Sequence, residues 1–413
     1  MTRLATYLLF LIFCNHVLAS EDWPEFRGPT GQGHAKKENV PLRWSDKEHV
    51  KWKTEVPGLG WSSPVYSHGE IWLTTSLNEG SELRACCFEM ETGDLKRNIV
   101  VFGENSAKSI HGKNSHASPT PLLQGDRVYV HFGTYGTACL SRAGDILWKA
   151  KLDYEPQHGP GGSPVLFENL LIINCDGTDI QFVVALDKNS GDVLWKTPRT
   201  HASEARLTGK KSPPMAFSTP LIIEHQGQPL VISAGSDHVA AYDARTGKEV
   251  WWSQYDGYSV VPRPVSAHGM IFVSSSYDGP ELFAVRLGGQ GNVTDSHVAW
   301  TLKKGAPHNP SPIVVDNEIY VVSDRGILTC LDAVDGKKHW QKRIGGNFSA
   351  SPIYVDGRIY LTDEKGNTTV IQPGKKYVEL AKNSIGDRTL ASLAPLNGGM
   401  LIRTQDYLYR IEN

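Results

Sequence analysis

The sequence lacks a dominant charge of either sign. Its 413 residues carry 42 Lys and Arg against 44 Asp and Glu, so the formal net charge is −2. A chain this balanced offers no basic surface for a nucleic acid or an anionic membrane, and we expect neither as a partner. Cysteine is also scarce, with six residues, and no Cys-x-x-Cys or His-x-x-x-His spacing occurs. We therefore expect no metal site built on cysteine and histidine.

The motifs of several common enzyme classes are missing as well. The chain has no HExxH motif, no phosphate-binding loop, no EF-hand loop, no CxxCH haem attachment and no Ser-His-Asp order. Beyond the N-terminus no apolar run approaches the length of a transmembrane segment. These absences remove the enzyme classes that are easiest to recognise from sequence.

The first 19 residues predict a signal peptide. Arg3 supplies a positive start, residues 4–13 an apolar stretch, and residues 17–19 a plausible cleavage site. The apolar stretch is too short to span a bilayer, so we expect a periplasmic or secreted protein without a membrane span. Five cysteines remain after processing, and an odd number argues against a full disulfide framework.

What the sequence does contain is one pattern repeated along its length. A small residue and a proline precede a β-branched run, a polar turn and a second apolar strand, as in SSPVYSHGEIWLTT from Ser62. The proline recurs at positions 64, 121, 164, 220, 264, 312 and 352, and Leu393 takes its place in the last copy. Intervals of 40 to 57 residues, with four strands in each, are typical of propeller blades.

A tryptophan ends most of the repeats. ALDKNSGDVLW ends at Trp195 and CLDAVDGKKHW at Trp340, each with a glycine four residues earlier. We predict a glycine turn followed by an outer strand whose tryptophan docks on the neighbouring blade, burying about 150–250 Å². The predicted docking residues are Trp52, Trp148, Trp195, Trp251, Trp300 and Trp340.

Together these patterns predict an all-β protein, an eight-bladed β-propeller of four-stranded antiparallel blades. Only three strands fit after Leu393, and the missing outer strand is available in HVKWKTEV near the N-terminus. Pairing the N- and C-terminal strands closes the ring and removes an exposed sheet edge. We expect an N-terminal arm at 20–41 lying across the ring and the propeller itself at 42–413.

The repeat resembles the pyrroloquinoline-quinone (PQQ) type of propeller repeat over essentially all of the mature chain. That family includes quinoprotein alcohol dehydrogenases and the BamB type of outer-membrane assembly factor. The opening WPEFRGPTGQG, followed by GWSSPV, is similar to an exported bacterial subgroup described as PQQ-binding-like. For the dehydrogenase branch the resemblance implies PQQ and Ca²⁺ as cofactors and a vicinal disulfide at Cys86 and Cys87. Within the repeat, however, Cys87 aligns with Ala185 and Ala241, a place that suits any small apolar side chain.

The polar segments before each small residue–proline pair should line one mouth of the channel. They differ from blade to blade, so their side chains are candidates for binding a ligand or a partner; alternatively, they cap strand ends and bind water. The candidates are Asn114, His116, His158, Arg263, His308, Asn309, Asn347 and Arg388. A second set of loops adds Asp176, Asp237 and Asp324 as Ca²⁺ ligands, as a general base or as ordinary turn residues.

Three functions stay open. The first is an exported non-catalytic propeller that binds a protein partner or a small polar ligand of the cell envelope at one mouth of the channel. The second is a PQQ- and Ca²⁺-dependent oxidoreductase of alcohols or sugars, implied by the quinoprotein resemblance. The third is a carbohydrate-binding propeller in which Trp61, Tyr135, Tyr258 and Tyr277 stack on sugars. We favour the first, because the blades are compact and no acid–base cluster stands out, and we expect a monomer.

Overall fold

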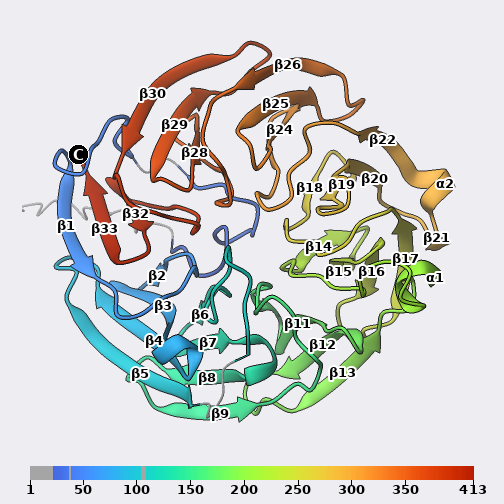
Figure 1. Ribbon diagram of the computed structural model, residues 1–413, viewed down its shortest axis with the longest axis horizontal. Coiled ribbons are helices and arrows are strands. Elements are labelled where there is room, and N and C mark those ends of the chain that lie inside the picture. The colour runs from blue at the N-terminus through green and yellow to red at the C-terminus, as the bar shows by residue number, and fades with distance from the viewer. Residues whose placement is uncertain (1–21, 37–38, 104–107) are drawn as a thin grey trace, which may run out of the picture.

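The computed structural model describes residues 22–36, 39–103 and 108–413. The predicted signal peptide at 1–19 lies outside the described residues. Figure 1 shows a ring of sheets around a central axis, which the chain builds one after another. The described residues form eight sheets, each with a core of four antiparallel strands and one with an added fifth strand, and this confirms the predicted eight-bladed propeller.

Blades 1 to 4 are numbered here in chain order, and in each the first strand lies nearest the axis (Figure 1). Blade 1 contains β2 (Val65–Ser67), β3 (Glu70–Leu77), β4 (Glu82–Glu89) and β5 (Leu95–Gly103). Blade 2 contains β6 (Leu122–Gln124), β7 (Arg127–His131), β8 (Thr137–Ser141) and β9 (Ile146–Ala150). Blade 3 contains β10 (Val165–Phe167), β11 (Leu170–Asp176), β12 (Gln181–Asp187) and β13 (Val193–Pro198). Blade 4 contains β14 (Leu221–His225), β15 (Gln228–Gly235), β16 (His238–Asp243) and β17 (Glu249–Gln254).

Blades 5 to 8 complete the ring. Blade 5 contains β18 (Val265–Ala267), β19 (Met270–Ser274), β20 (Leu282–Arg286) and β22 (Val298–Leu302). Blade 6 contains β23 (Ile313–Val315), β24 (Glu318–Val322), β25 (Ile327–Asp332) and β26 (Lys338–Arg343). Blade 7 contains β27 (Ile353–Val355), β28 (Arg358–Thr362), β29 (Asn367–Gln372) and β30 (Val378–Ser384). Blade 8 contains β31 (Ala394–Leu396), β32 (Gly399–Arg403), β33 (Tyr407–Glu412) and β1 (Val50–Glu55).

Blade 8 joins the two ends of the propeller. β1 pairs antiparallel with β33, with Trp52 opposite Arg410 and Glu55 opposite Tyr407. The prediction that the N-terminal strand closes the last blade is therefore confirmed. Blade 4 differs from the prediction by a fifth strand, β21 (Gly291–Asn292), which pairs parallel with the outer strand β17.

Helices are few and short. They are α1 (Glu204–Leu207), α2 (Thr294–His297) and the 3-10 turns η1 (Asn78–Gly80) and η2 (Gly133–Tyr135). In the part of the chain that the structure describes, no helix has the length and apolar character needed to cross a membrane.

Successive residues of β4 show how the blades pack against one another. Cys86 belongs to the apolar cluster shared with blade 8, and Cys87 to the cluster shared with blade 2. The two side chains point to opposite faces because alternation along a strand requires it. Both are buried and both thiols are free, so no vicinal disulfide forms.

The tryptophans predicted to dock lie at the interfaces between blades. Five of them donate an indole N–H to a backbone carbonyl of the next blade: Trp52 to Met90, Trp148 to Lys188, Trp195 to Ala244, Trp300 to Ala333 and Trp340 to Gly374. The sixth, Trp251, is buried beside β21, and its indole nitrogen has no partner among the described residues. In blade 1, Arg97 occupies the equivalent position, opposite Cys87, and donates to the carbonyl of Ala143.

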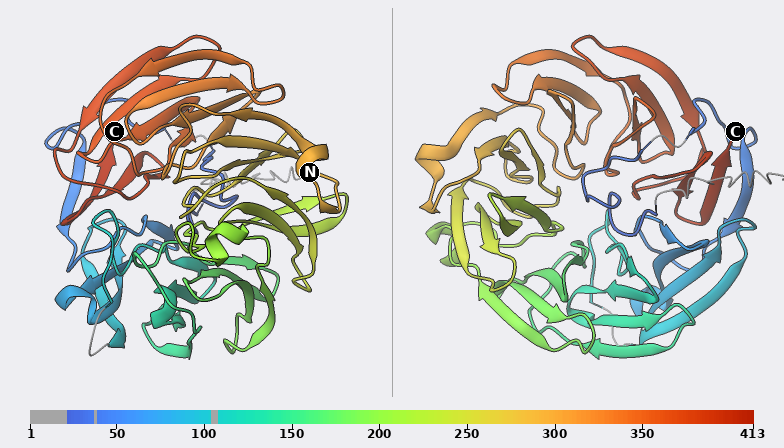
Figure 2. Two further views of the ribbon diagram at one scale, coloured as in Figure 1. Left: turned by 45° about the vertical axis from the view of Figure 1, so that its right-hand side comes forward. Right: turned by 180° about the vertical axis from the view of Figure 1, so that it is seen from behind.

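The N-terminal segment crosses the ring on one side of the propeller, as Figure 2 shows from behind. Trp23 forms an isolated bridge with Tyr66 of blade 1. His34 forms another with Tyr354 of blade 7. Farther along, Trp44 is buried and stacks on Tyr360, at a centroid distance of 6.0 Å. The segment is therefore held to blades 1 and 7, the two neighbours of the closing blade 8.

Candidate functional site

The N-terminal arm covers one end of the central channel. Arg27 is 1% exposed and donates from Nη2 to the carbonyl of Pro312 at 2.8 Å. Pro312 directly precedes β23, the innermost strand of blade 6, so Arg27 ties the arm to the inner edge of that blade. Phe26, the preceding residue of the arm, lines the cavity above it. The arm thus provides the floor of that cavity.

A cavity of about 340 Å³ occupies the centre of the ring, a size within the range of small-molecule sites. Aromatic rings from several blades form much of its wall: Trp61, Phe217, Tyr258 and Tyr277. Three basic or titratable side chains also line it: His111, Lys113 and His158. Among the described residues, none of those lining the cavity is Asp or Glu. The wall is therefore rich in hydrogen-bond donors and aromatic surface and carries no negative charge.

A ring of hydroxyl groups surrounds the base of the cavity. Its seven members, which we call the hydroxyl ring, are Ser63, Thr120, Ser163, Thr219, Ser311, Ser351 and Ser392. Each hydroxyl oxygen accepts the backbone N–H of the residue at the same place in the preceding blade, at 2.9 to 3.1 Å. These residues precede the repeated proline (Leu393 in blade 8), so the repeat itself builds the ring. In blade 5, Arg263 takes the eighth position.

Three of the predicted candidates line the cavity: Asn114, His158 and Asn309. Nε2 of His158 lies 3.2 Å from the Tyr258 hydroxyl, and Asn114 donates to the His158 carbonyl at 2.7 Å. Partial burial, with a smaller effect from neighbouring His111, lowers the pKa of His158. Tyr258 and Tyr277 pair through their backbones, so this side of the wall joins residues of two loops.

Four other candidates lie near the mouth without lining the cavity. His116 is buried, and its Nε2 lies 2.8 Å from the Lys108 carbonyl. His308 contacts Asp324 at 3.1 Å and packs on Tyr277. Asn347 and Arg388 are exposed, and the Arg388 guanidinium lies 5.2 Å from the centre of the Trp61 ring. These side chains support or surround the mouth.

Arg263 lies on the opposite side from the one its sequence position suggested. Its side chain is 2% exposed, and both terminal nitrogens lie 3.1 Å from one oxygen of Glu25. The same guanidinium donates to the carbonyls of Phe26 and Pro220. The side chain points to the arm because Glu25 supplies the only nearby negative charge on that side among the described residues. Arg263 therefore holds the arm to the ring and does not reach the mouth.

The three predicted carboxylates are each engaged by a neighbour. Asp176 forms a buried ion pair with Arg199 at 2.8 Å, and burial, only partly offset by Arg199, raises its pKa to about 6. Asp324 accepts from the backbone N–H of His308 and from the Asn309 amide, and these contacts outweigh burial and lower its pKa. Both carboxylates therefore act as supports for neighbouring groups.

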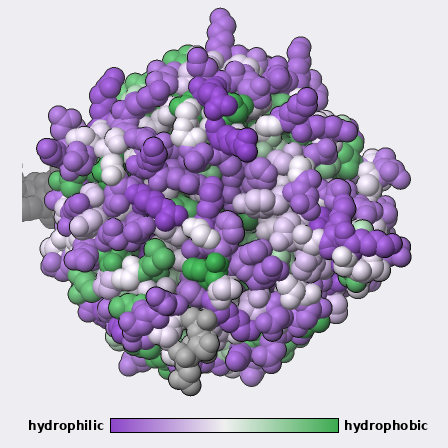
Figure 3. Space-filling view, in the orientation of Figure 1, coloured by the Kyte–Doolittle hydropathy of each residue, from purple (hydrophilic) through white to green (hydrophobic). Residues whose placement is uncertain are grey.

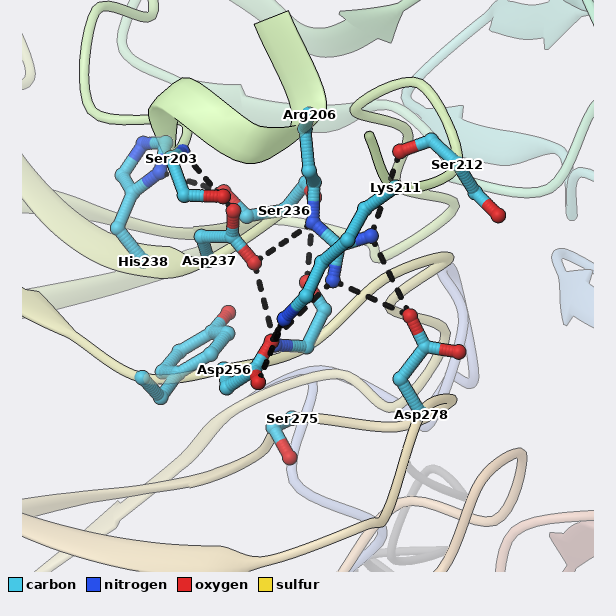
Figure 4. Close-up of polar contacts among 12 residues, drawn as sticks. Ser203, Arg206, Lys211, Ser212, Ser236, Asp237, His238, Asp256, Ser275 and Asp278 are labelled. Atoms are coloured by element: carbon cyan, nitrogen blue, oxygen red, sulfur yellow. Dashed lines mark hydrogen bonds and ion pairs between the residues drawn. The ribbon is translucent and has the colours of Figure 1, made fainter. Parts of the chain in front are cut away.

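Asp237 belongs to a cluster around Arg206 of α1, drawn in Figure 4. The Arg206 side chain is completely buried and lies 2.8 Å from Asp237, 3.3 Å from Asp278 and 3.4 Å from Asp256. Asp237 also accepts the Ser203 backbone N–H at 2.9 Å, and its pKa is lowered despite burial. One guanidinium thus bridges carboxylates of two blades, Lys211 adds a second positive charge beside Asp256, and the cluster fixes the segment that carries α1. Among the residues that the structure describes, no three His, Cys, Asp or Glu side chains are grouped to hold a metal ion.

Sequence reasoning missed several residues of the cavity. His111 and Lys113 belong to HGKNSHAS, the segment that supplied two candidates, and Phe217 precedes the pair Ser218–Thr219. Their place before the repeated proline is the same signal that identified Asn114. Phe26 had no such signal, because its position depends on how the arm folds back. Of the aromatic residues considered for sugar stacking, Trp61, Tyr258 and Tyr277 line the cavity, while Tyr135 lines a neighbouring pocket of about 30 Å³.

The lining residues do not fit a calcium–quinone pair. Protein Ca²⁺ sites use oxygen ligands that generally include carboxylates. In the described part of the chain the cavity offers hydroxyls, amides and imidazoles, and the nearest predicted carboxylate, Asp324, is already bound by His308 and Asn309. The two adjacent cysteines are buried inside blade 1, away from the cavity.

Comparison with known proteins places the chain in a family. The family described as outer membrane protein assembly factor BamB matches residues 43–293 and 291–375. The chain therefore belongs to this family of PQQ-repeat β-propellers. Its fold is similar to that of BamB from Moraxella catarrhalis, with a TM-score of 0.61, 13% identity and coverage of 88% of this chain and 97% of that one.

Quinoprotein dehydrogenases are also similar to this chain, either in fold or in a stretch of sequence. Quinohemoprotein alcohol dehydrogenase from Comamonas testosteroni has a TM-score of 0.68 and 12% identity, over 94% of this chain and 80% of that one. A lanthanide-dependent methanol dehydrogenase of Methylorubrum extorquens is 28% identical over 159 residues, which make up 35% of this chain and 24% of that enzyme. The chain thus spans about a quarter of that relative. At these identities the structural likeness shows the fold alone.

Proposed function

We propose that the protein is an exported, non-catalytic binding propeller whose central cavity takes a small polar ligand through the open mouth. The observation that carries the proposal is the cavity itself, about 340 Å³ in volume, floored by the arm and lined by aromatic rings, amides and hydroxyls. A few polar groups set among aromatic surface are the usual composition of a small-molecule site. The predicted signal peptide supports a place in the cell envelope.

The absence of catalysis is part of the proposal. General acid–base chemistry needs a titratable group that can reach the ligand and exchange a proton. The carboxylates near the mouth are held by Arg199, by Arg206, or by His308 and Asn309. His158 is the lining residue best suited to proton transfer, but its Nε2 faces the Tyr258 hydroxyl. Tyr258 is in turn paired with Tyr277 through the backbone. The arrangement favours recognition over proton transfer.

A protein partner is compatible with the same mouth. Figure 3 shows a face that is mostly hydrophilic, with apolar residues scattered across it. Such a surface suits a polar, reversible contact more than a large permanent interface. A partner that reaches into the cavity would present one side chain or a tight turn there, and would use the same lining residues.

Thermal unfolding with a panel of sugars, amino acids and dicarboxylates tests the proposal. A ligand at a hundred times its Kd adds about 2.7 kcal/mol of stability, which a melting curve resolves. We expect Tyr258→Phe combined with His158→Ala to weaken binding at least tenfold while leaving the unliganded Tm nearly unchanged. Tyr377→Phe, at the outer edge of blade 7, is the matched control. Equal binding by the cavity variant and the control would place the ligand elsewhere, and a panel without any shift would count against a small ligand.

The second candidate, an oxidoreductase, is favoured by the stretch of 28% identity to the methanol dehydrogenase. Adding PQQ with Ca²⁺ to the same melting experiment, followed by a dye-linked alcohol oxidation assay, separates the two functions. Stabilisation together with turnover would replace the binding proposal with the oxidoreductase. Because the lining carries no carboxylate in the described residues, we expect neither effect.

A further inference from the structure

The innermost strand of each blade leaves one backbone position unpaired, which we call the edge position. It is the second residue after the repeated proline, or after Leu393 in blade 8. The first two strands of a blade form a hairpin in which hydrogen-bonded pairs alternate, so the N–H and C=O of the edge position point away from the hairpin. In blade 1 the edge position is Tyr66, and it exchanges two hydrogen bonds with Trp23 of the arm, at 2.9 and 3.0 Å. A free strand edge of this kind is a template for an added strand.

The arm uses the edge positions of four blades. The carbonyls of Trp23, Pro24 and Gly33 accept the N–H in blades 1, 2 and 7, and the side-chain oxygen of Gln32 accepts it in blade 5. Because Trp23 and Pro24 are consecutive, a short piece of extended chain is enough to span the innermost strands of two neighbouring blades. The arm therefore shows how a peptide binds to this side of the ring.

In blades 3 and 4 the arm leaves the edge positions uncovered. After Pro24 the chain continues to blade 5, where Glu25 binds Arg263, without contacting the edge of either blade. The edge positions there are Leu166 and Ile222, both half-buried. Among the described residues nothing accepts their outward N–H groups or donates to their outward carbonyls.

The other two blades do not share this feature. The edge position of blade 8 is Pro395, which has no N–H to donate. In blade 6 it is Val314, which is buried, and His34 of the arm hydrogen-bonds to its backbone. Unpaired strand edges that lie next to each other therefore occur at blades 3 and 4.

A groove of about 400 Å³ lies at these two edges. Leu166 and Ile222 line it on the side of the blades, and Pro29 and Thr30 of the arm are among the residues that line it on the other. Glu224, two residues after Ile222 on β14, also lines the groove, is exposed, and forms no ion pair among the described residues. The second carboxylate of the lining, that of Glu25, is already paired with Arg263. The groove thus combines two free strand edges with one uncompensated negative charge.

We propose that this groove, between the arm and the edges of β10 and β14, binds an extended basic peptide segment of a partner protein. The peptide spans the two edges as Trp23 and Pro24 span β2 and β6, and its carbonyls accept the N–H groups of Leu166 and Ile222. In strand addition the main-chain hydrogen bonds supply affinity, and side chains at alternate positions supply specificity. A lysine or arginine beside Glu224 supplies that specificity here. The groove is at the arm end of the channel, so the proposal is independent of a ligand at the mouth.

Fluorescence anisotropy of the labelled peptide KVTVTVK with the whole protein tests the proposal. We expect saturable binding, and at least tenfold weaker binding of EVTVTVE, because its glutamates meet Glu224. The KVTVTVK peptide with methylated backbone nitrogens cannot form an added strand, and we expect it to bind at least tenfold more weakly as well. Equal binding of the three peptides, or binding of none of them, would overturn the proposal.

Hydrogen exchange locates the bound peptide. The amides of Leu166 and Ile222 face the groove without an acceptor, so they should exchange at least tenfold more slowly in the complex. Slower exchange confined to the mouth, or to an outer strand such as β13, would show that the peptide binds elsewhere and would contradict the proposal.

A proline variant removes one edge donor. Leu166→Pro reproduces the situation that blade 8 already has with Pro395, so the fold should accept it. We expect it to weaken the binding of KVTVTVK at least tenfold. Val314→Pro, at the same place of the repeat in blade 6 and outside the groove, is the matched control. Equal affinities of the two variants for the peptide would count against the site.

A charge variant keeps the test decisive if the proline variant does not fold. Glu224→Lys changes an exposed side chain and should reverse the preference, so that EVTVTVE binds more tightly than KVTVTVK. Glu55→Lys, at an exposed position of the outer strand β1, is the control and should leave the preference for KVTVTVK unchanged. If Glu224→Lys also keeps that preference, the peptide does not lie in this groove.

Discussion

The cavity wall at the mouth and the arm at the other end of the channel are held by different kinds of contact. At the arm end, Arg263 and Glu25 form a buried ion pair, and Arg27 is closed off beneath the ring. In the cavity wall at the mouth, His158 and Tyr258 are half-buried and meet through a neutral hydrogen bond. The arm end therefore depends on compensated buried charge, which is expensive to disturb. The mouth can change its side chains at little cost to the fold.

This contrast shows that a residue that departs from the repeat can have one of two roles. Arg263 and His158 both stand where other blades carry different side chains before or at the repeated motif. One is used to attach the arm and the other to shape the cavity. Departure from a repeat identifies a residue with a special contact, and the direction of the side chain decides whether that contact serves stability or binding.

The largest expected effect is at the arm end. Arg263→Ala leaves Glu25 buried without its partner and removes the bonds to two carbonyls, so we expect a loss of about 3–5 kcal/mol in the free energy of unfolding. Urea unfolding measures it. The double variant Arg263→Met with Glu25→Gln should recover part of the loss, because it removes both charges. A single variant as stable as the native protein would show that the arm is not held by this pair.

A smaller loss in the free energy of unfolding is expected when the pH is lowered, and it comes from residues at the mouth end. Burial lowers the pKa of His131 to about 4 and that of His238 to about 3, while each titrates near 6.5 when unfolded. Below pH 6.5 the unfolded chain takes up these protons and the folded chain does not, so stability is lost as the pH falls toward 4. Asp176, whose pKa is raised to about 6, acts in the opposite direction over the same range but is a single group.

We therefore expect a net loss of about 3 kcal/mol between pH 7 and pH 4, measured by urea unfolding at each pH. His131→Phe should flatten the dependence, since its imidazole is buried and, among the described residues, its one hydrogen bond is to Thr137. The arm end should not add to the loss, because burial raises the pKa of Glu25, and proton uptake there favours the folded state. If stability falls with pH as steeply in His131→Phe as in the native protein, other groups cause the acid sensitivity.

The fold could be predicted because its causes are local and repeated. Seven of the eight copies carry the proline that starts an innermost strand, and most carry the tryptophan that contacts the next blade, so eight copies and the closure by Trp52 follow from spacing. The small residue before each proline was also visible, and in seven blades its hydroxyl builds the ring. Because these positions repeat, the sequence alone was enough to predict them.

The site could be predicted only in part. The segments that form the mouth were found from their place before the proline, and Asn114, His158 and Asn309 do line the cavity. The direction of Arg263 depends on Glu25, which lies 238 residues away in sequence, and the floor depends on Phe26 of the same arm. Contacts between a non-repeating arm and a repeating ring leave no periodic signal, so the sequence alone could not place them.

A matched pair of glycines tests the contrast with the smallest changes. Gly31 in the arm and Gly279 in a mouth loop both have positive φ, of 67° and 104°. A Cβ on Gly279 meets nothing within 4 Å, so Gly279→Ala should cost only the backbone strain of about 1–2 kcal/mol. A Cβ on Gly31 would lie 2.3 Å from the Arg263 guanidinium, which must then move away from Glu25.

Gly31→Ala should therefore lose more stability than Gly279→Ala, by about 1 kcal/mol or more, in parallel urea titrations. The φ of Gly279 lies farther from the left-handed region that L residues tolerate than the φ of Gly31, so backbone strain alone would make Gly279→Ala the costlier variant. A larger loss for Gly31→Ala therefore reports the displaced guanidinium. In the Arg263→Met background the excess cost of Gly31→Ala should shrink, because the guanidinium that it displaces is gone. Equal losses in the two single variants would mean that the arm tolerates displacement as readily as the mouth does, and the distinction between the two ends would fail.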